Sequence, residues 1–221
     1  MIAGLRAGLR GLAHLWRRSY LYVWANLFWA LLTLLVITAP AAFAGLIRLG
    51  YVAHREPLVS LDDFWQGFRA TWKLGILLAI INVLCIMITF SNLISYAPET
   101  GLGFVVLRFV WLGSLLLWLI TQYFAWVFYF GMKRPTFIGA LRNAAVMMLR
   151  NPLFTLGILI ILFILMSIST VLPAAWILIG GAGMASIANS AVQDRLRNAG
   201  LEPPEAPFDE GGIVEPSFSD I

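Results

Sequence analysis

Few side chains in this sequence have the chemistry of a catalytic group. The chain holds one cysteine, Cys85, and two histidines, His14 and His54, which lie forty residues apart. A lone cysteine forms neither an intrachain disulfide nor a cysteine-based metal cluster. The sequence also lacks an HExxH motif, a Walker A loop and a credible Ser/His/Asp set. It therefore predicts a non-enzymatic protein with no catalytic residue, no metal ligand and no cofactor.

Uncharged amides are the polar groups that recur inside the apolar runs, at Asn26, Asn82, Asn92, Gln122 and Asn189. An amide in hydrocarbon needs a hydrogen-bond partner. We therefore expect these side chains to bond between helices, or alternatively to line a path for an uncharged polar solute.

Arg108 is the ionisable residue that lies nearest the interior of an apolar run. It is expected to anchor at the membrane interface or to pair with Glu99, with a substrate contact as the alternative. Intramembrane carboxylates, lysines and histidines mark proton relays. The predicted spans contain none of them, which argues against a proton-coupled pump.

The composition indicates the class of protein that must position these groups. Of the 221 residues, 61% are hydrophobic and 12% are charged, and the mean hydropathy is +0.87. Soluble domains average about 45–50% apolar and about 25% charged residues. This excludes a soluble globular fold, and the high hydrophobicity excludes disorder. The sequence therefore predicts an all-α, polytopic transmembrane helical bundle.

Five apolar runs are long enough to be predicted as membrane spans, at 20–37, 74–94, 104–130, 153–172 and 174–192. A sixth, shorter element is predicted at 40–53. Thr38 and Pro40 favour a break before it, because Thr38 can cap a helix whose first turn holds Pro40. Residues 20–53 then form a hairpin; the alternative is one kinked helix that places the N-terminus outside.

Lys and Arg flank one end of each predicted span. They occur before residue 20, in the 48–73 and 131–150 connections and after residue 193, whereas the 95–103 connection has none. Positive residues stay in the cytoplasm. We therefore expect a bacterial cytoplasmic-membrane protein with a cytoplasmic C-terminus and, given the hairpin, a cytoplasmic N-terminus.

Amphipathic helices are predicted at the cytoplasmic surface over residues 2–18, 61–73 and 136–150. They should bind anionic headgroups or dock a partner protein. The candidate partner or lipid surface is made of aromatic, apolar and basic side chains: Phe64, Trp65, Phe68, Arg69, Trp72, Lys73, Arg134, Phe137, Leu141 and Arg142.

Charge divides the chain into a single transmembrane domain, 1–198, and a flexible acidic tail, 199–221. The tail holds six acidic and no basic residues, so the rest of the chain has a net charge of about +10. With this hydropathy, anionic lipid headgroups explain the basic excess better than nucleic acid does.

Three motifs carry a resemblance to a known family. They are Trp24-Ala-Asn26-Leu-Phe-Trp29, the break from Ile37 to Ala41 followed by Gly45 and Arg48, and Phe64-Trp65-x-Gly67-Phe68-Arg69-x-x-Trp72-Lys73. Over residues 10–195 the chain resembles the YesL-like bacterial membrane proteins, a domain of unknown function. The resemblance implies a multi-pass inner-membrane protein linked to carbohydrate uptake or utilisation, and it carries over no catalytic residue.

Competing functions follow from these patterns. The first is a non-enzymatic accessory protein whose cytoplasmic helices contact importer subunits or another membrane protein. The alternative is a small permease for uncharged solutes. An enzyme acting on lipid or glycan is the third, with Arg108 and Glu99 as the residues to test.

Overall fold

Every regular element in the part of the chain that the structure describes is a helix. The computed structural model describes residues 1–56 and 58–202, so nearly all of the predicted acidic tail lies outside the described residues. The helices are α1 (Ile2–Arg17), α2 (Ser19–Thr33), α3 (Ala39–Ala53), α4 (Leu61–Ser95), α5 (Leu102–Gly131), α6 (Phe137–Arg150), α7 (Pro152–Val171), α8 (Pro173–Ala175), the π-helix η1 (Trp176–Gly180) and α9 (Gly181–Asn198). The predicted all-α class is confirmed.

Four helical segments are long and apolar enough to cross a membrane: α4, α5, α7 and the continuous run from α8 through η1 to α9, Pro173–Asn198. The first predicted span is shorter than expected, because α2 ends at Thr33 rather than Ile37 and has 15 residues. At 1.5 Å per residue it measures about 22 Å, less than the ~30 Å core of a bilayer.

Residues 19–53 form a helical hairpin, as the break at Thr38 and Pro40 predicted. The chain reverses after α2, so that Arg18 Nη2 donates to the Glu56 carbonyl oxygen at 3.3 Å. Pro40 lies in the first turn of α3. Thr38 does not cap α3 with its side chain, as was expected. Its hydroxyl instead donates back to the Leu32 carbonyl oxygen and stabilises the turn.

The predicted surface helix 61–73 and the predicted span 74–94 are one helix. α4 runs without a break for 35 residues, about 52 Å. Its start is held by Asp63, whose carboxylate accepts the Ser60 backbone N–H at 3.0 Å. Gly75 does not interrupt it, because a Cβ there would lie 2.5 Å from the Ala41 Cβ, so the missing side chain lets α3 and α4 touch.

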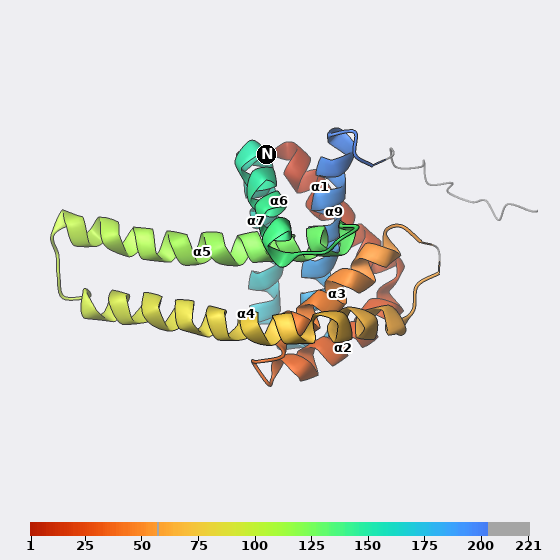
Figure 1. Cartoon of the computed structure of the whole chain (residues 1–221), viewed down its shortest axis with the longest axis horizontal. Coiled ribbons are helices and arrows are strands. Elements are labelled where there is room, and N and C mark those ends of the chain that lie inside the picture. Colours follow the sequence, from red (N-terminus) through yellow and green to blue (C-terminus); the bar gives the residue numbers. More distant parts are fainter. Residues whose placement is uncertain (57, 203–221) are drawn as a thin grey trace, which may run out of the picture.

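The helices run in two directions. α4 and α5 form a long antiparallel hairpin along the molecule, whereas α1, α6, α7 and α9 run across it (Figure 1). We call residues 77–119 of this hairpin the arm, and the rest of the described chain the body. One flat bilayer therefore cannot lie perpendicular to both groups of helices.

α1 packs into the body instead of lying free at a surface. Its buried face consists of small residues such as Gly4 and Gly11, where a Cβ would collide with the backbone of α7 and of α9. Leu9 and Trp16, although apolar, are 55% and 80% exposed. The face of α1 that is buried is therefore the one whose small residues let the backbones approach closely, and not the one with the most hydrophobic side chains.

Candidate functional site

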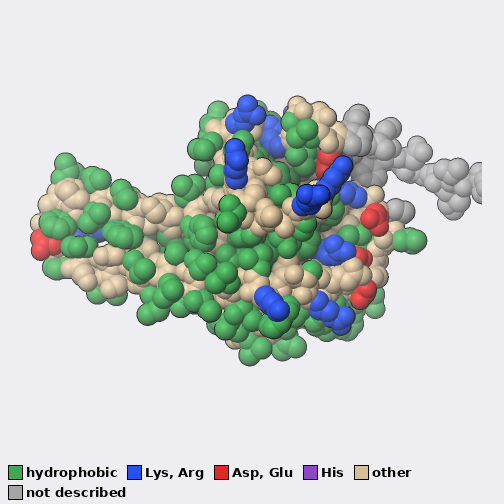
Figure 2. Space-filling model, viewed as in Figure 1, with side chains coloured by type: hydrophobic (Ala, Val, Ile, Leu, Met, Phe, Trp, Pro, Cys, Tyr) green, Lys and Arg blue, Asp and Glu red, His purple; other side chains and the backbone are tan. Residues whose placement is uncertain are grey.

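Basic side chains gather on the body, whereas the arm is largely apolar apart from charge near its tip (Figure 2). One group of these basic side chains lies where α1, the end of α3, the α6–α7 junction and the end of α9 meet. We call this the basic end, and its arginines are Arg10, Arg17, Arg55, Arg150, Arg195 and Arg197.

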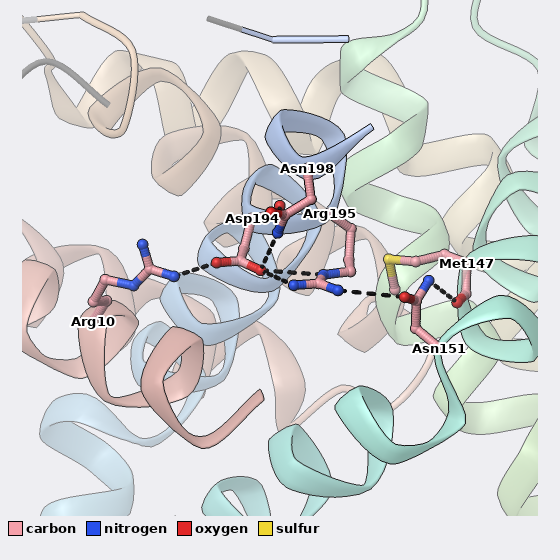
Figure 3. Close-up of polar contacts among 6 residues, drawn as sticks. All are labelled: Arg10, Met147, Asn151, Asp194, Arg195 and Asn198. Carbon is pink, nitrogen blue, oxygen red and sulfur yellow. Dashed lines mark hydrogen bonds and ion pairs between the residues drawn. The ribbon is translucent and has the colours of Figure 1, made fainter. Parts of the chain in front are cut away.

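Asp194 of α9 joins the elements of the basic end (Figure 3). Its carboxylate accepts from Arg10 of α1 and from Arg195, and its side chain is only 12% exposed. Arg195 Nη1 also donates to Asn151 Oδ1 at 3.3 Å, which brings the end of α9 against the start of α7. α7 and the last helical run are therefore antiparallel.

His14 and His54 stack with ring centroids 3.7 Å apart. Each ring donates one N–H to a backbone carbonyl: His54 Nδ1 to Gly50 at 2.7 Å, and His14 Nε2 to Ala53 at 3.1 Å. The other nitrogen of His54 lies 3.4 Å from the Ser190 hydroxyl, which can donate to it. A carbonyl oxygen can only accept a hydrogen bond, so each of these two ring nitrogens carries a proton.

The environment of His54 opposes its protonation. Burial, followed by the charge of His14, lowers the pKa of His54 to about 3, and the positive charges of Arg55 and Arg197 act in the same direction. The imidazole is therefore neutral at neutral pH. Nothing in the sequence signals the pair, because the α2–α3 hairpin alone brings residues forty positions apart into contact.

Besides a cavity of about 740 Å³ beside the Arg10–Asp194 ion pair, two others open at the basic end. The first, about 230 Å³, is lined by Arg10, Ala13, His14, Arg17, His54, Ser190, Gln193 and Arg197. The second, about 480 Å³, lies between α3, α5, α6 and α9 and contains the ion pair of Arg55 with Glu202. The described lining of the first cavity is basic and polar, and one of its arginines, Arg10, is paired with Asp194.

Four of the five predicted amides bond between helices. Asn82 and Gln122 exchange hydrogen bonds across α4 and α5, with Gln122 Nε2 donating to Asn82 Oδ1 at 2.7 Å. Asn26 bonds the backbone of η1. Asn189 Nδ2 donates to the Ile47 carbonyl oxygen of α3 at 3.1 Å.

Asn92 behaves differently, because it donates within α4, to the Ile88 carbonyl oxygen at 2.9 Å, and it is partly exposed. The interhelical interpretation therefore holds for the other four amides. None of the five is among the described lining residues of the cavities at the basic end.

The predicted partner surface is split by the fold. Arg69, Trp72, Lys73, Arg134 and Arg142 are exposed, as that prediction requires. Phe64, by contrast, is fully buried and packs 6.3 Å from Phe28, ring centre to ring centre. The expectation that Phe64 lies at the surface is wrong, because α3 covers it at Gly45.

The remaining apolar members of that surface are partly buried: Trp65, Phe68, Phe137 and Leu141. Phe137, for example, lies 4.9 Å from the Trp126 ring of α5. The apolar stripes of these amphipathic helices thus face other helices as well as the surroundings.

Arg108 is an anchor for the arm tip. Its guanidinium donates to the backbone carbonyl oxygens of Tyr96, Ala97 and Glu99, which follow the end of α4. It meets Glu99 through the backbone rather than through the carboxylate. Basic side chains stabilise helix C-termini in this way, so Arg108 closes the connection between α4 and α5.

No set of three or more His, Cys, Asp or Glu side chains is placed to hold a metal ion within residues 1–56 and 58–202. When the chain was compared with protein-family models, with curated proteins and with solved structures, no match was found in any of the three. Its function is therefore argued from its own residues and geometry.

Proposed function

We propose that this chain is a multi-pass protein of the bacterial cytoplasmic membrane that serves as a non-enzymatic accessory protein in carbohydrate uptake or utilisation. It would do so by presenting exposed basic and aromatic side chains of α4 and α6 to subunits of an importer. The resemblance to the YesL-like proteins supplies the link to carbohydrate, and the geometry supports membrane insertion and docking.

The observation that carries the proposal is the arm. Large hydrophobic side chains cover its outside, with Leu77, Met87 and Ile94 of α4 and Phe109 of α5 between 54% and 72% exposed. An apolar surface of this extent is not stable in water. The α4 half of the arm, residues 77–95, is about 28 Å long, which matches a bilayer core of about 30 Å.

Charge at the two ends of the arm supports one orientation. Its tip carries Glu99 in a connection without Lys or Arg, whereas Lys73 and Lys133 lie at the body. The positive-inside rule places the body, and with it both chain termini, on the cytoplasmic side. The outer face of α7, which exposes Leu156, Phe163 and Val171, gives the body a second apolar contact with lipid.

The exposed partner residues lie on two elements of that body. α4 presents Arg69, Trp72 and Lys73, and α6 presents Arg142 near Ile138, which is 83% exposed. Aromatic residues and arginine are enriched at protein interfaces, and tryptophan and arginine are among the commonest residues of high binding energy. These side chains therefore form the docking surface in the proposal.

Co-purification tests the docking. The full chain is extracted from native membranes in mild detergent after cross-linking, and importer subunits are sought by mass spectrometry. We expect Trp72→Ala to reduce recovery of the partner strongly. Trp24→Ala is the matched control, because Trp24 has similar exposure, 43% against 48%, but lies on α2. Recovery of no importer subunit with the unaltered chain contradicts the accessory function.

Cysteine accessibility tests the orientation separately. After Cys85→Ser, single cysteines replace Arg69, Arg142 or Glu99. Labelling from outside the cell is expected only at position 99. External labelling at position 69 or 142 contradicts the layout, whatever the partner proves to be.

The alternative, a permease for uncharged solutes, has less support. Asn82 and Gln122, which motivated it, bond each other. Flux of sugars into proteoliposomes is its direct test.

A further inference from the structure

The turn between α2 and α3 exposes consecutive large apolar side chains. We call residues 34–38 the hairpin tip. Its apolar side chains are 46% to 78% exposed, and they are Leu34, Leu35, Val36 and Ile37. The sequence has no charged residue between Arg18 and Arg48, so the tip lies in the middle of a long uncharged stretch. A contiguous apolar patch of this kind marks a surface that contacts something other than water.

We propose that the hairpin tip is inserted among the acyl chains of the cytoplasmic leaflet, beside the arm, and turns back there without crossing the bilayer. Lipid is its occupant. This contact is separate from those of the arm and of α7, and it would hold the body against the membrane. It goes beyond the accessory function and needs no importer, although its leaflet follows from the proposed orientation.

The backbone of the hairpin tip satisfies its own hydrogen bonds. Backbone N–H groups that donate to carbonyl oxygens within residues 30–36 belong to Leu34, Leu35, Val36, Ile37 and Ala39. Pro40 has no N–H to satisfy. The hydroxyls of Thr33 and Thr38 donate to further carbonyl oxygens, of Trp29 and Leu32. Unpaired backbone groups are what keeps irregular segments out of hydrocarbon, and these bonds remove much of that cost.

Val36 supports an apolar surrounding. Its φ is 38°, in the left-handed region that a β-branched residue rarely adopts. Glycine or asparagine would fit this backbone at lower cost. The local conformation therefore does not explain a valine here, whereas contact of its exposed side chain with acyl chains does.

The hairpin tip lies beside the base of the arm (Figure 1). Ala41, in the first turn of α3, packs on Gly75, two residues before the arm begins. A shallow cavity of about 210 Å³ joins the two elements and is lined by Thr38, Ala41, Phe68, Arg69, Trp72 and Ile76. Hydrophobic side chains also gather at this lower edge of the body (Figure 2). The tip therefore continues the apolar surface of the arm.

The length of the hairpin favours re-entry over crossing. α2 and α3 have 15 residues each, about 22 Å, and a bilayer core is about 30 Å thick. Their other ends meet where Arg18 donates to the Glu56 carbonyl oxygen, and Arg17 and Arg55 lie beside these ends. The positive-inside rule keeps both ends in the cytoplasm. We expect an insertion of about 5–10 Å, as for other interfacial segments.

Spin-label accessibility tests the insertion. After Cys85→Ser, a single spin-labelled cysteine replaces Leu35 in the full chain, in vesicles of phosphatidylcholine and phosphatidylglycerol. Oxygen concentrates in hydrocarbon, whereas a polar nickel chelate stays in water. We expect the label at position 35 to collide more often with oxygen than with the chelate. If this label disturbs folding, Leu34, which is 78% exposed, takes its place.

Two control positions calibrate the measurement. Leu58 is apolar and 86% exposed, but it follows α3 at the charged end of the hairpin. Its ratio of oxygen to chelate collisions should be several-fold lower than at position 35. Met87, in the middle of the arm, should give a higher ratio than position 35, because it lies deeper. Position 35 decides the proposal and position 87 decides the insertion of the arm, so the two failures are distinguishable.

Three results overturn the proposal. One is a ratio at position 35 as low as at position 58, which would place the tip in water. Another is labelling of the cysteine at position 35 by an impermeant maleimide from outside the cell, which would show that the hairpin crosses. The last is spectral broadening that disappears when the labelled chain is diluted with unlabelled chain, which would make a second copy the occupant.

Discussion

The side-chain amide of Asn26 is inserted into the backbone ladder of the last helical run, where its Nδ2 donates to the carbonyl oxygen of Ile177 at 2.7 Å. The same nitrogen lies 3.0 Å from the Trp176 carbonyl oxygen, and the Asn26 Oδ1 accepts the Ala182 backbone N–H at 2.7 Å. The π-helix η1 begins at Trp176. Insertion of a side chain into the ladder accounts for this widened turn, since it occupies groups that a regular helix would pair internally.

Replacing Asn26 is expected to destabilise the fold. Asn26→Ala leaves two carbonyl oxygens and one N–H without the amide, and an unsatisfied buried polar group costs about 1–3 kcal/mol. The free energy of unfolding, measured by denaturant titration in detergent, should fall by that order. Asn92→Ala is the control, because the partly exposed amide of Asn92 bonds only its own helix. An equal effect of the two changes would contradict the role of Asn26.

The amide pair of the arm should be energetically coupled. Asn82 Oδ1 accepts from Gln122 Nε2 at 2.7 Å and from Trp118 Nε1 at 2.9 Å. Asn82→Ala should therefore cost more than Gln122→Ala. A double-mutant cycle on the unfolding free energy should give a coupling of about 0.6–1.7 kcal/mol, the range found for such bonds in membranes. Additive effects would show that the two amides do not bond.

Two glycines of the same hairpin should respond oppositely to the same change. Gly75→Ala places a methyl group 2.5 Å from the Ala41 Cβ, so α3 and α4 must separate, at a cost of about 1–3 kcal/mol. Gly113→Ala meets nothing within 4 Å and should stabilise α5 by about 0.5–1 kcal/mol. Thermal unfolding of both variants checks this. A tolerated Gly75→Ala would argue against the tight α3–α4 contact.

Stability should fall on mild acidification because of His54. Its pKa is about 3 in the folded chain and about 6.5 when unfolded, so between these values the unfolded chain binds the extra proton. His54 therefore does not lower the free energy of unfolding above pH 6.5, and it lowers that free energy progressively as the pH falls below 6.5. The unfolding midpoint should decrease from pH 6.5 down to about pH 5, above the range in which carboxylates titrate. His54→Gln should flatten this decrease; an unchanged slope would assign it to other groups.

Several features could be read from local sequence because their causes are local. Thr38 and Pro40 break the chain, so the hairpin of α2 and α3 was predictable. The start of α4 also has a local cause, because the Asp63 carboxylate accepts the Ser60 backbone N–H three residues before it. The need of an amide for a partner in an apolar run led to the interhelical bonds of Asn82 and Gln122.

The exposure of particular faces was not predictable in the same way. Phe64 was expected at the surface because it lies on an amphipathic stripe, but α3 covers it at Gly45. In α1 the glycine face is buried and Trp16 is exposed. Hydrophobicity ranks side chains for removal from water, whereas in these contacts the closest approach of two backbones decides which face packs.

Composition and the placement of apolar runs by themselves determined that this chain forms long apolar helices of the membrane type. Both are local properties, because they depend on residue type and on how apolar residues follow one another along the sequence. Only the tertiary structure decided that α4 and α5 cross the direction of α7 and α9, that His14 stacks on His54, and that Asp194 joins Arg10 to Arg195. These relationships join residues up to 184 positions apart. They follow from how the small-residue faces of different helices fit together, which no local pattern encodes.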